Sequence, residues 1–156
     1  MKITKEFLKK KMACNEGTKY AIKNNLIGKN DIDVLNHLIK DNRLQWANWL
    51  IVRVMEYKQY VSYAVFAAEQ VIDLYEKKYP NDVRPRKAIE AAKKCIENPS
   101  AKNKNDVVAD AAAAYAAAAY AAADAAADAA DAADADADAM RIKILQYGIS
   151  LLEKEK

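Results

Sequence analysis

Residues 44–57 read LQWANWLIVRVMEY, and this stretch decides the fold class of the chain. Trp46, Trp49, Leu50 and Arg53 follow one another at intervals of three, one and three residues. Because an α-helix completes a turn about every 3.6 residues, side chains with this spacing lie along one stripe of a helix. The stretch therefore predicts an amphipathic helix with two tryptophans on its apolar face.

The segments around this stretch show the same helical spacing. Only 3 Gly and 3 Pro interrupt the 156 residues, which leaves few positions for the turns that a sheet protein needs. Further helices are expected over residues 5–13, 19–24, 31–40, 59–78 and 85–98, with caps at Thr4, Thr18 and Asn81-Asp82, and with Asn30-Asp31 at the start of the third. We predict an all-α fold, a compact multi-helix bundle.

Alanine dominates the region that follows residue 105, and alanine is the best helix former. One helix over residues 106–154 would extend roughly 70 Å, which is too long for a domain of this size to cover. We expect a turn near residues 131–138, where closely spaced Asp side chains compete for backbone donors. The prediction is a single helical domain over residues 1–156. It combines a basic helical body, residues 1–99, with an Ala/Asp-rich helical tail, residues 105–156, packed against it.

The net charge of +3 hides a strong asymmetry along the chain. Residues 105–139 contain eight Asp and no Lys or Arg, so the remaining 25 basic and 14 acidic residues leave the rest of the chain at +11. Such a body could fold against its own tail, assemble head to tail or bind an anion, and two solvated faces remain the simplest alternative. The Asp tract would repel phosphates, which argues against nucleic acid as the partner.

The N-terminus and the cysteines predict a cytoplasmic protein. Residues 1–12 form a Lys-rich amphipathic stretch without the apolar segment of a signal peptide. No apolar run reaches the roughly 20 residues that cross a bilayer, apart from the Ala tract with its repeated Asp. Cys14 and Cys95 are the only cysteines, and we expect both to be free thiols in a reducing compartment.

No catalytic or metal-binding signature is recognisable in the sequence. His37 is the only histidine and lies on a Leu-rich helix, so no nucleophile has an evident general base. The motifs of zinc sites and of phosphate- and dinucleotide-binding loops are absent, and the Asp residues lie along a helix rather than on a calcium loop. We therefore predict no enzymatic activity, no cofactor and no metal site.

Trp46, Trp49 and Arg53 form the first candidate binding site. Two tryptophans three residues apart, with an arginine one turn further on, could stack on and clamp a planar anion or an acidic group of a partner. The alternative is an apolar core stripe in which Arg53 pairs with a nearby Asp.

Arg84, Arg86 and Lys87 form the second candidate site, at the start of a helix. Basic side chains add to the N–H groups exposed at a helix N-terminus, which suits a phosphate or a carboxylate. Positive charge at this end opposes the helix dipole, so we expect compensation by a ligand or by internal ion pairs. In the internal alternative, Arg84 or Arg86 binds Asp82 or Asp41 and locks the loop.

These same segments carry a resemblance to a known family. The chain resembles an immunity protein family of bacteria and phages through an alanine-dominated helical tail and three segments: Cys14…Gly17, Trp46-x-x-Trp49-Leu50-x-x-Arg53 and Asp82-x-Arg84-Pro85-Arg86-Lys87-Ala88-Ile89-Glu90-Ala91-Ala92. In the tail, Asp and Tyr stand where family members often carry Arg and His. The resemblance implies neutralisation of a target rather than catalysis, in the host cytoplasm if a phage encodes the chain.

Three functions stay open at this point. The first is a non-catalytic neutralising protein of a conflict system, for immunity or anti-defence, that binds and sequesters a protein toxin or defence effector. The second is a sponge for a small anionic nucleotide signal, held by Arg53, Arg84 and Arg86 with Trp46, Trp49 or a tyrosine stacking on the base. The third is a structural protein that forms homo-oligomers through the smooth alanine face of residues 111–127.

Overall fold

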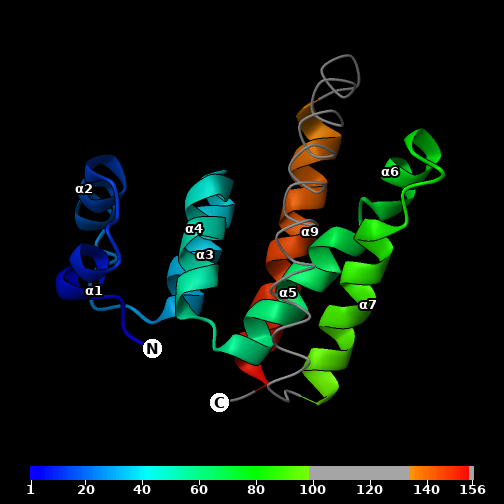
Figure 1. Cartoon of the computed structure of the whole chain (residues 1–156). Coiled ribbons are helices and arrows are strands. Elements are labelled where there is room, and N and C mark those ends of the chain that lie inside the picture. Colours follow the sequence, from blue (N-terminus) through cyan, green and yellow to red (C-terminus); the bar gives the residue numbers. More distant parts are fainter. Residues whose placement is uncertain (99–133, 155–156) are drawn as a thin grey trace. The chain divides into compact units, whose positions relative to one another are not determined.

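The computed structural model describes residues 1–98 and 134–154, and these residues are helical throughout most of their length (Figure 1). Paired extended backbone within them is limited to one antiparallel bridge between Lys2 and Asn30. The all-α prediction is therefore confirmed. The helices of the described residues are α1 (Lys5–Lys10), α2 (Asn15–Lys23), α3 (Asp31–Lys40), α4 (Leu44–Val54), α5 (Tyr57–Glu69), α6 (Ile72–Lys78), α7 (Arg84–Glu97) and α9 (Asp134–Glu153).

The chain divides into two compact units. The first unit combines Met1–Glu56 with Leu145–Lys156, and the second unit is Tyr57–Ile144. Helix α9 supplies its C-terminal part to the first unit, which includes the buried side chains of Leu145, Ile149 and Leu152. The single-domain organisation stays a prediction, and much of the Ala/Asp-rich tail lies outside the described residues.

The first two helices are capped by side chains that precede them. Thr4 Oγ1 accepts a hydrogen bond from Phe7 N at 3.1 Å, which confirms the predicted start of α1. Helix α1 ends earlier than expected, because Met12 takes a left-handed conformation (φ 57°) while Ala13 N donates to Leu8 O at 2.9 Å. This closure turns the chain sharply from α1 into α2.

The predicted start of the second helix, with a cap at Thr18, is wrong. Helix α2 begins at Asn15, and its cap is Cys14, whose Sγ accepts a hydrogen bond from Gly17 N at 3.3 Å. Gly17 lies in the first turn, where a Cβ atom would stand 3.3 Å from Cys14 Sγ and 3.9 Å from the Trp46 ring. Glycine is therefore present for close packing rather than to end a helix.

Helices α3 and α4 pack on each other and form the core of the first unit. Helix α3 begins at Asp31, as the sequence predicts, and Asn30 caps it, because Asn30 Oδ1 accepts a hydrogen bond from Asp33 N at 2.8 Å. Leu35 of α3 and Ile51 of α4 are fully buried, and burying such a side chain stabilises a fold by roughly 1.5–3 kcal/mol. The predicted start of α4 at Leu44 is confirmed, and the helix ends at Val54 because Met55 is extended.

In the second unit, the single helix predicted over residues 59–78 is two helices. Helix α5 ends at Glu69 and α6 begins at Ile72, because Val71 leaves the helical region (φ −121°, ψ −8°). Its N–H bonds Ala68 O at 3.1 Å, the tighter spacing of a 3₁₀ turn, and Gln70 Nε2 donates to Phe66 O at 3.1 Å. The break lets Ile72 join Val61, Val65 and Ile89 in one apolar core.

Helix α7 packs on α5 and begins at Arg84, one residue before the predicted start, with Pro85 in its first turn. The cap predicted at Asn81-Asp82 is wrong, because Val83 takes the cap position and no side chain of the described residues caps this helix. Cys95 of α7 is 1 % exposed, and both cysteines are free thiols, as expected. The turn predicted at residues 131–138 falls partly outside the described residues, and its described part, residues 134–138, belongs to the continuous helix α9.

Candidate partner-binding cavity

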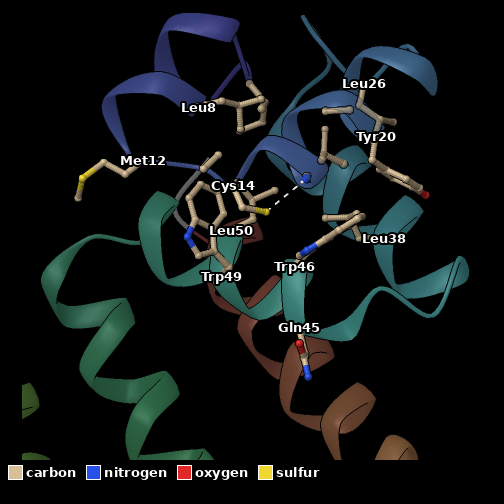
Figure 2. A pocket seen from close by; sticks show the side chains of 15 residues that line it. Leu8, Met12, Cys14, Tyr20, Leu26, Leu38, Gln45, Trp46, Trp49 and Leu50 are labelled. Carbon is tan, nitrogen blue, oxygen red and sulfur yellow. Dashed lines mark hydrogen bonds between the residues drawn. The ribbon is translucent and has the colours of Figure 1, made fainter.

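An open cavity of about 320 Å³ lies in the first unit (Figure 2). Its walls come from α1 to α4 and the segments that join them, all within residues 3–50. Most of the lining side chains are apolar, with Leu8 and Met12 on one side and Trp46, Trp49 and Leu50 on α4. Two of the six predicted site residues, Trp46 and Trp49, therefore share a cavity, because one helical turn separates them.

The capping contact of Cys14 shapes the cavity wall beside the tryptophans. Figure 2 shows the Sγ atom of Cys14 near the Trp46 and Trp49 rings, with its hydrogen bond from Gly17 N drawn as a dashed line. Cys14 is exposed, whereas both indole rings are half-buried. The wall beside the tryptophans is therefore accessible to solvent at Cys14.

Tyr20 closes another part of the wall and is fixed by a polar contact. Its ring centroid lies 5.1 Å from that of Trp46, and its hydroxyl donates a hydrogen bond to Asp41 Oδ2. Burial and, secondly, the bond to Asp41 raise the pKa of Tyr20 to about 12. The phenol therefore stays neutral at physiological pH, and the carboxylate of Asp41 is already engaged within the chain.

Two guanidinium groups stand over the aromatic rings of the cavity. The Arg53 Cζ atom lies 4.3 Å from the Trp49 ring centroid, and Arg43 Cζ lies 5.3 Å from that of Trp46 and 5.6 Å from that of Tyr20. Arg53 Nη1 also donates to Trp49 O at 2.9 Å. Within the described part of the chain neither arginine forms a salt bridge, so the Asp partner considered for Arg53 is absent from these residues.

Arg43 is not among the site residues predicted from the sequence. Arg43 precedes Trp46 by three residues, as Arg53 follows Trp49 by four, so helical spacing read backward from Trp46 would have found it. The site therefore has an arginine at each end of α4.

Arg84 and Arg86 are both held by carboxylates of the second unit. Arg84 binds Asp82 through two bonds, Nε to Oδ1 at 2.8 Å and Nη2 to Oδ2 at 2.7 Å. Arg86 binds Glu76 in the same two-pronged way, with Nε to Oε1 at 2.7 Å. This geometry matches the internal alternative, with Asp82 as one acceptor and with Glu76 in place of Asp41.

Hydrogen bonds explain the ionisation of these carboxylates. The Arg84 guanidinium and, secondly, the Tyr75 hydroxyl hold the pKa of Asp82 well below its usual range, and Arg86 lowers the pKa of Glu76. The remaining predicted residue, Lys87, is exposed. The six predicted residues thus divide equally between the units, with Arg84, Arg86 and Lys87 in the second.

The His37 ring lies next to the Tyr20 ring, with their centroids 6.1 Å apart. Its Nε2 atom is buried and has no hydrogen-bond partner in residues 1–98 or 134–154. No group of three or more His, Cys, Asp and Glu side chains in those residues could hold a metal ion. None of the described helices is both long and apolar enough to span a membrane.

Two overlapping regions of the chain match two different family models. Residues 1–59, which contain the whole cavity, are similar to the YdhT N-terminal domain. Residues 51–101, which contain Arg53 and the Arg84–Arg86 segment, match the family of the Imm-5 like putative immunity protein. The resemblance to immunity proteins is thus confirmed over this segment. No curated protein and no solved structure matches the chain.

Proposed function

We propose that this chain is a non-enzymatic neutralising protein of a bacterial or phage conflict system, which binds and sequesters a protein toxin or defence effector. The match of residues 51–101 to an immunity protein family supports binding of a partner. The apolar cavity of the first unit supports a protein as that partner, because apolar pockets with aromatic walls are where interfaces place their anchor residues.

One observation carries the choice of a protein over a nucleotide. Arg84 and Arg86 each spend their planar fork on a carboxylate of their own chain. A phosphate would have to displace two hydrogen bonds from each guanidinium before it gained any. This cost argues against these arginines as the grip of a nucleotide sponge.

The proposal is tested in two steps. The tagged full-length chain is used to retain proteins from the bacterial cells that encode it, or from phage-infected cells if a phage encodes it, and retained proteins are identified. Each is then expressed alone and together with the chain. We expect at least one retained protein to inhibit growth alone and to lose its toxicity with the chain. Retention of only non-toxic proteins, or toxicity that the chain does not relieve, would contradict the proposal.

A nucleotide sponge remains a second candidate because of the first unit. Arg43 and Arg53 stand beside stacked aromatic rings and are not engaged by carboxylates of the described residues. Calorimetry with a panel of cyclic and linear nucleotides would support the sponge if binding weakened with salt and was lost in Arg53→Gln or Arg43→Gln without unfolding. Equal affinity of wild type and variants for every nucleotide rejects it.

A structural role through residues 111–127 concerns residues outside the described ranges. It predicts self-association of the purified chain. Light scattering that gives a monomer mass at every concentration would remove this role.

A further inference from the structure

We infer that the cavity of the first unit receives an apolar anchor side chain from an acidic segment of the partner protein, whose carboxylates meet Arg43 and Arg53. This inference rests on the proposed function in that the partner is a protein. It adds the site, residues 3–50 with Arg53, and the chemistry that the site selects.

The cavity has the size and lining for one large apolar side chain. Its volume of about 320 Å³ lies at the lower end of the range for binding pockets, roughly 300–1,000 Å³. Trp46 and Trp49 form a wall on which a ring can stack or an aliphatic chain can pack. An aromatic side chain of the partner would bury roughly 150–250 Å². An anchor residue would therefore gain most of its binding free energy here.

The mouth of the cavity carries an exposed apolar side chain. Met12 lines the cavity, yet it is 86 % exposed, and in Figure 2 its side chain extends away from the cavity wall. The left-handed backbone at Met12 and the bond from Ala13 N to Leu8 O fix this placement. Methionine adapts its shape to different apolar surfaces, which suits the rim of a docking site.

The charges around the cavity select the sign of the partner. Residues 1–56, the N-terminal segment of the first unit, carry 11 Lys and Arg against six Asp and Glu, an excess of +5. At the two ends of α4, Arg43 and Arg53 stack on the rings of the wall and lack salt bridges within the described residues. Asp41, the carboxylate beside Arg43, is bound by the Tyr20 hydroxyl. A carboxylate from outside would consequently meet guanidinium groups that the aromatic rings already orient.

The same chemistry exists within the chain itself. Residues 106–124 combine Asp with Tyr115 and Tyr120, so a second copy could supply an acidic segment with an aromatic anchor. We commit to a separate protein, because the matched immunity family implies a partner. A second copy as the occupant is an outcome that the experiment separates.

The test uses the fluorescence of the full-length chain, since its 2 tryptophans both line the cavity. The probe is an acidic peptide with one phenylalanine, EDSFEDS. Two matched peptides change one property each: EDSAEDS removes the anchor, and KKSFKKS reverses the charge. We expect the Kd of EDSFEDS, measured through the change in tryptophan emission, to be at least tenfold lower than that of either control. Its binding should weaken when salt rises from 0.1 M to 0.5 M, because carboxylate–guanidinium contacts at the surface are screened.

Three variants locate the binding. Arg43→Gln and Arg53→Gln should each weaken EDSFEDS at least fivefold, and Ala13→Phe should block the cavity while keeping both arginines. Arg141→Gln, which removes one arginine charge from the second unit, is the matched control and should leave binding unchanged. A circular dichroism melt accompanies each variant, and Ala13→Leu replaces Ala13→Phe if the latter does not fold.

Several results would overturn the inference. If EDSAEDS binds as tightly as EDSFEDS, the cavity does not receive an anchor side chain. If KKSFKKS binds as tightly as EDSFEDS, the site does not select an acidic partner. Tighter binding of free phenylpropionate than of the peptide would indicate a small-molecule site, and a mass that doubles with concentration and falls in Ala13→Phe would indicate a second copy. If Arg43→Gln and Ala13→Phe neutralise the toxin as well as wild type, the inference fails while the proposed function stands. If the peptide binds but no toxin is neutralised, the proposed function fails instead.

Discussion

Arginine pairs in the two units differ in what they bind. In the second unit, Arg84 and Arg86 each form a two-pronged pair with a carboxylate that lies close to them along the chain or on the neighbouring helix. In the first unit, Arg43 and Arg53 lie on aromatic rings and have no such carboxylate within the described residues. The comparison teaches that basic residues alone do not mark a binding site. The guanidinium groups that a protein orients but does not neutralise are the better candidates.

The largest effect on this comparison is expected from a variant that destabilises α4, the helix with Arg43 and Arg53 at its ends. Ile51 of α4 is fully buried, so Ile51→Ala should lower the free energy of unfolding by roughly 2–5 kcal/mol through lost apolar contact and a residual cavity. Urea unfolding followed by tryptophan fluorescence measures this change. Val52→Ala, at a half-buried neighbour, is the control and should cost clearly less. Equal losses for the two variants would mean that α4 is not packed as described.

A smaller effect is expected from removing the Tyr20 hydroxyl. Tyr20→Phe keeps the ring but deletes the bond to Asp41, which should cost about 0.5–1.5 kcal/mol and leave the Asp41 carboxylate available to Arg43. The first arginine pair would then resemble the second, so binding of the EDSFEDS peptide should weaken as well. Unchanged peptide affinity in a folded Tyr20→Phe protein would show that Asp41 does not compete for Arg43.

The same hydroxyl gives a pH dependence with a definite sign. The pKa of Tyr20 is raised in the folded protein to about 12, above its unfolded value near 10. Its contribution to stability is therefore complete below about pH 10 and is lost as the pH rises through about 12. Burial also raises the pKa of Tyr63 to about 12, so absorbance titration at 295 nm should show one late-titrating tyrosine fewer in Tyr20→Phe than in the wild type. If the number of late-titrating tyrosines is the same in that variant as in the wild type, the assignment to Tyr20 is wrong.

The smallest effect on stability is expected in the second unit. Arg84→Gln should raise the pKa of Asp82 toward its ordinary value, while stability at neutral pH changes little because the Arg84 side chain is exposed to solvent. Since the folded pKa of Asp82 is depressed, the contribution of its carboxylate is present above about pH 4 and is lost as the pH falls through the folded value. Carboxyl carbon NMR titration of both proteins measures the shift, and an identical Asp82 titration in the two would refute the pairing.

The sequence predicted those parts of the fold whose causes are local. The starts of α1 and α3 follow from local polar residues that cap them, that of α4 from helical spacing and that of α7 from proline in its first turn, and all were found to within one residue. The start of α2 was missed because the cap is the Cys14 thiol, which is not among the usual capping side chains. The break after α5 was missed because neither Gly nor Pro marks it; packing of Ile72 into the core decides it.

The candidate site divides in the same way. The spacing of Trp46 and Trp49 was sufficient to place both rings on one face of a helix, and the structure brings them into one cavity. The role of Arg84 and Arg86 could not be decided from spacing, because Glu76 lies ten residues before Arg86 on a separate helix. Only the tertiary arrangement reveals which guanidinium groups already have acceptors.

The division of the chain into units has a practical consequence for anyone who works with fragments. The second unit is nested inside the first, since the chain leaves the first unit after Glu56 and re-enters it at Leu145. Leu145, Ile149 and Leu152 are all buried, so a fragment trimmed to the first matched region, residues 1–59, would lack three apolar side chains of its own interior. A chain truncated before residue 145 would therefore lose part of the apolar core of the first unit, which contains the cavity, although the deleted residues lie far from the cavity in the sequence.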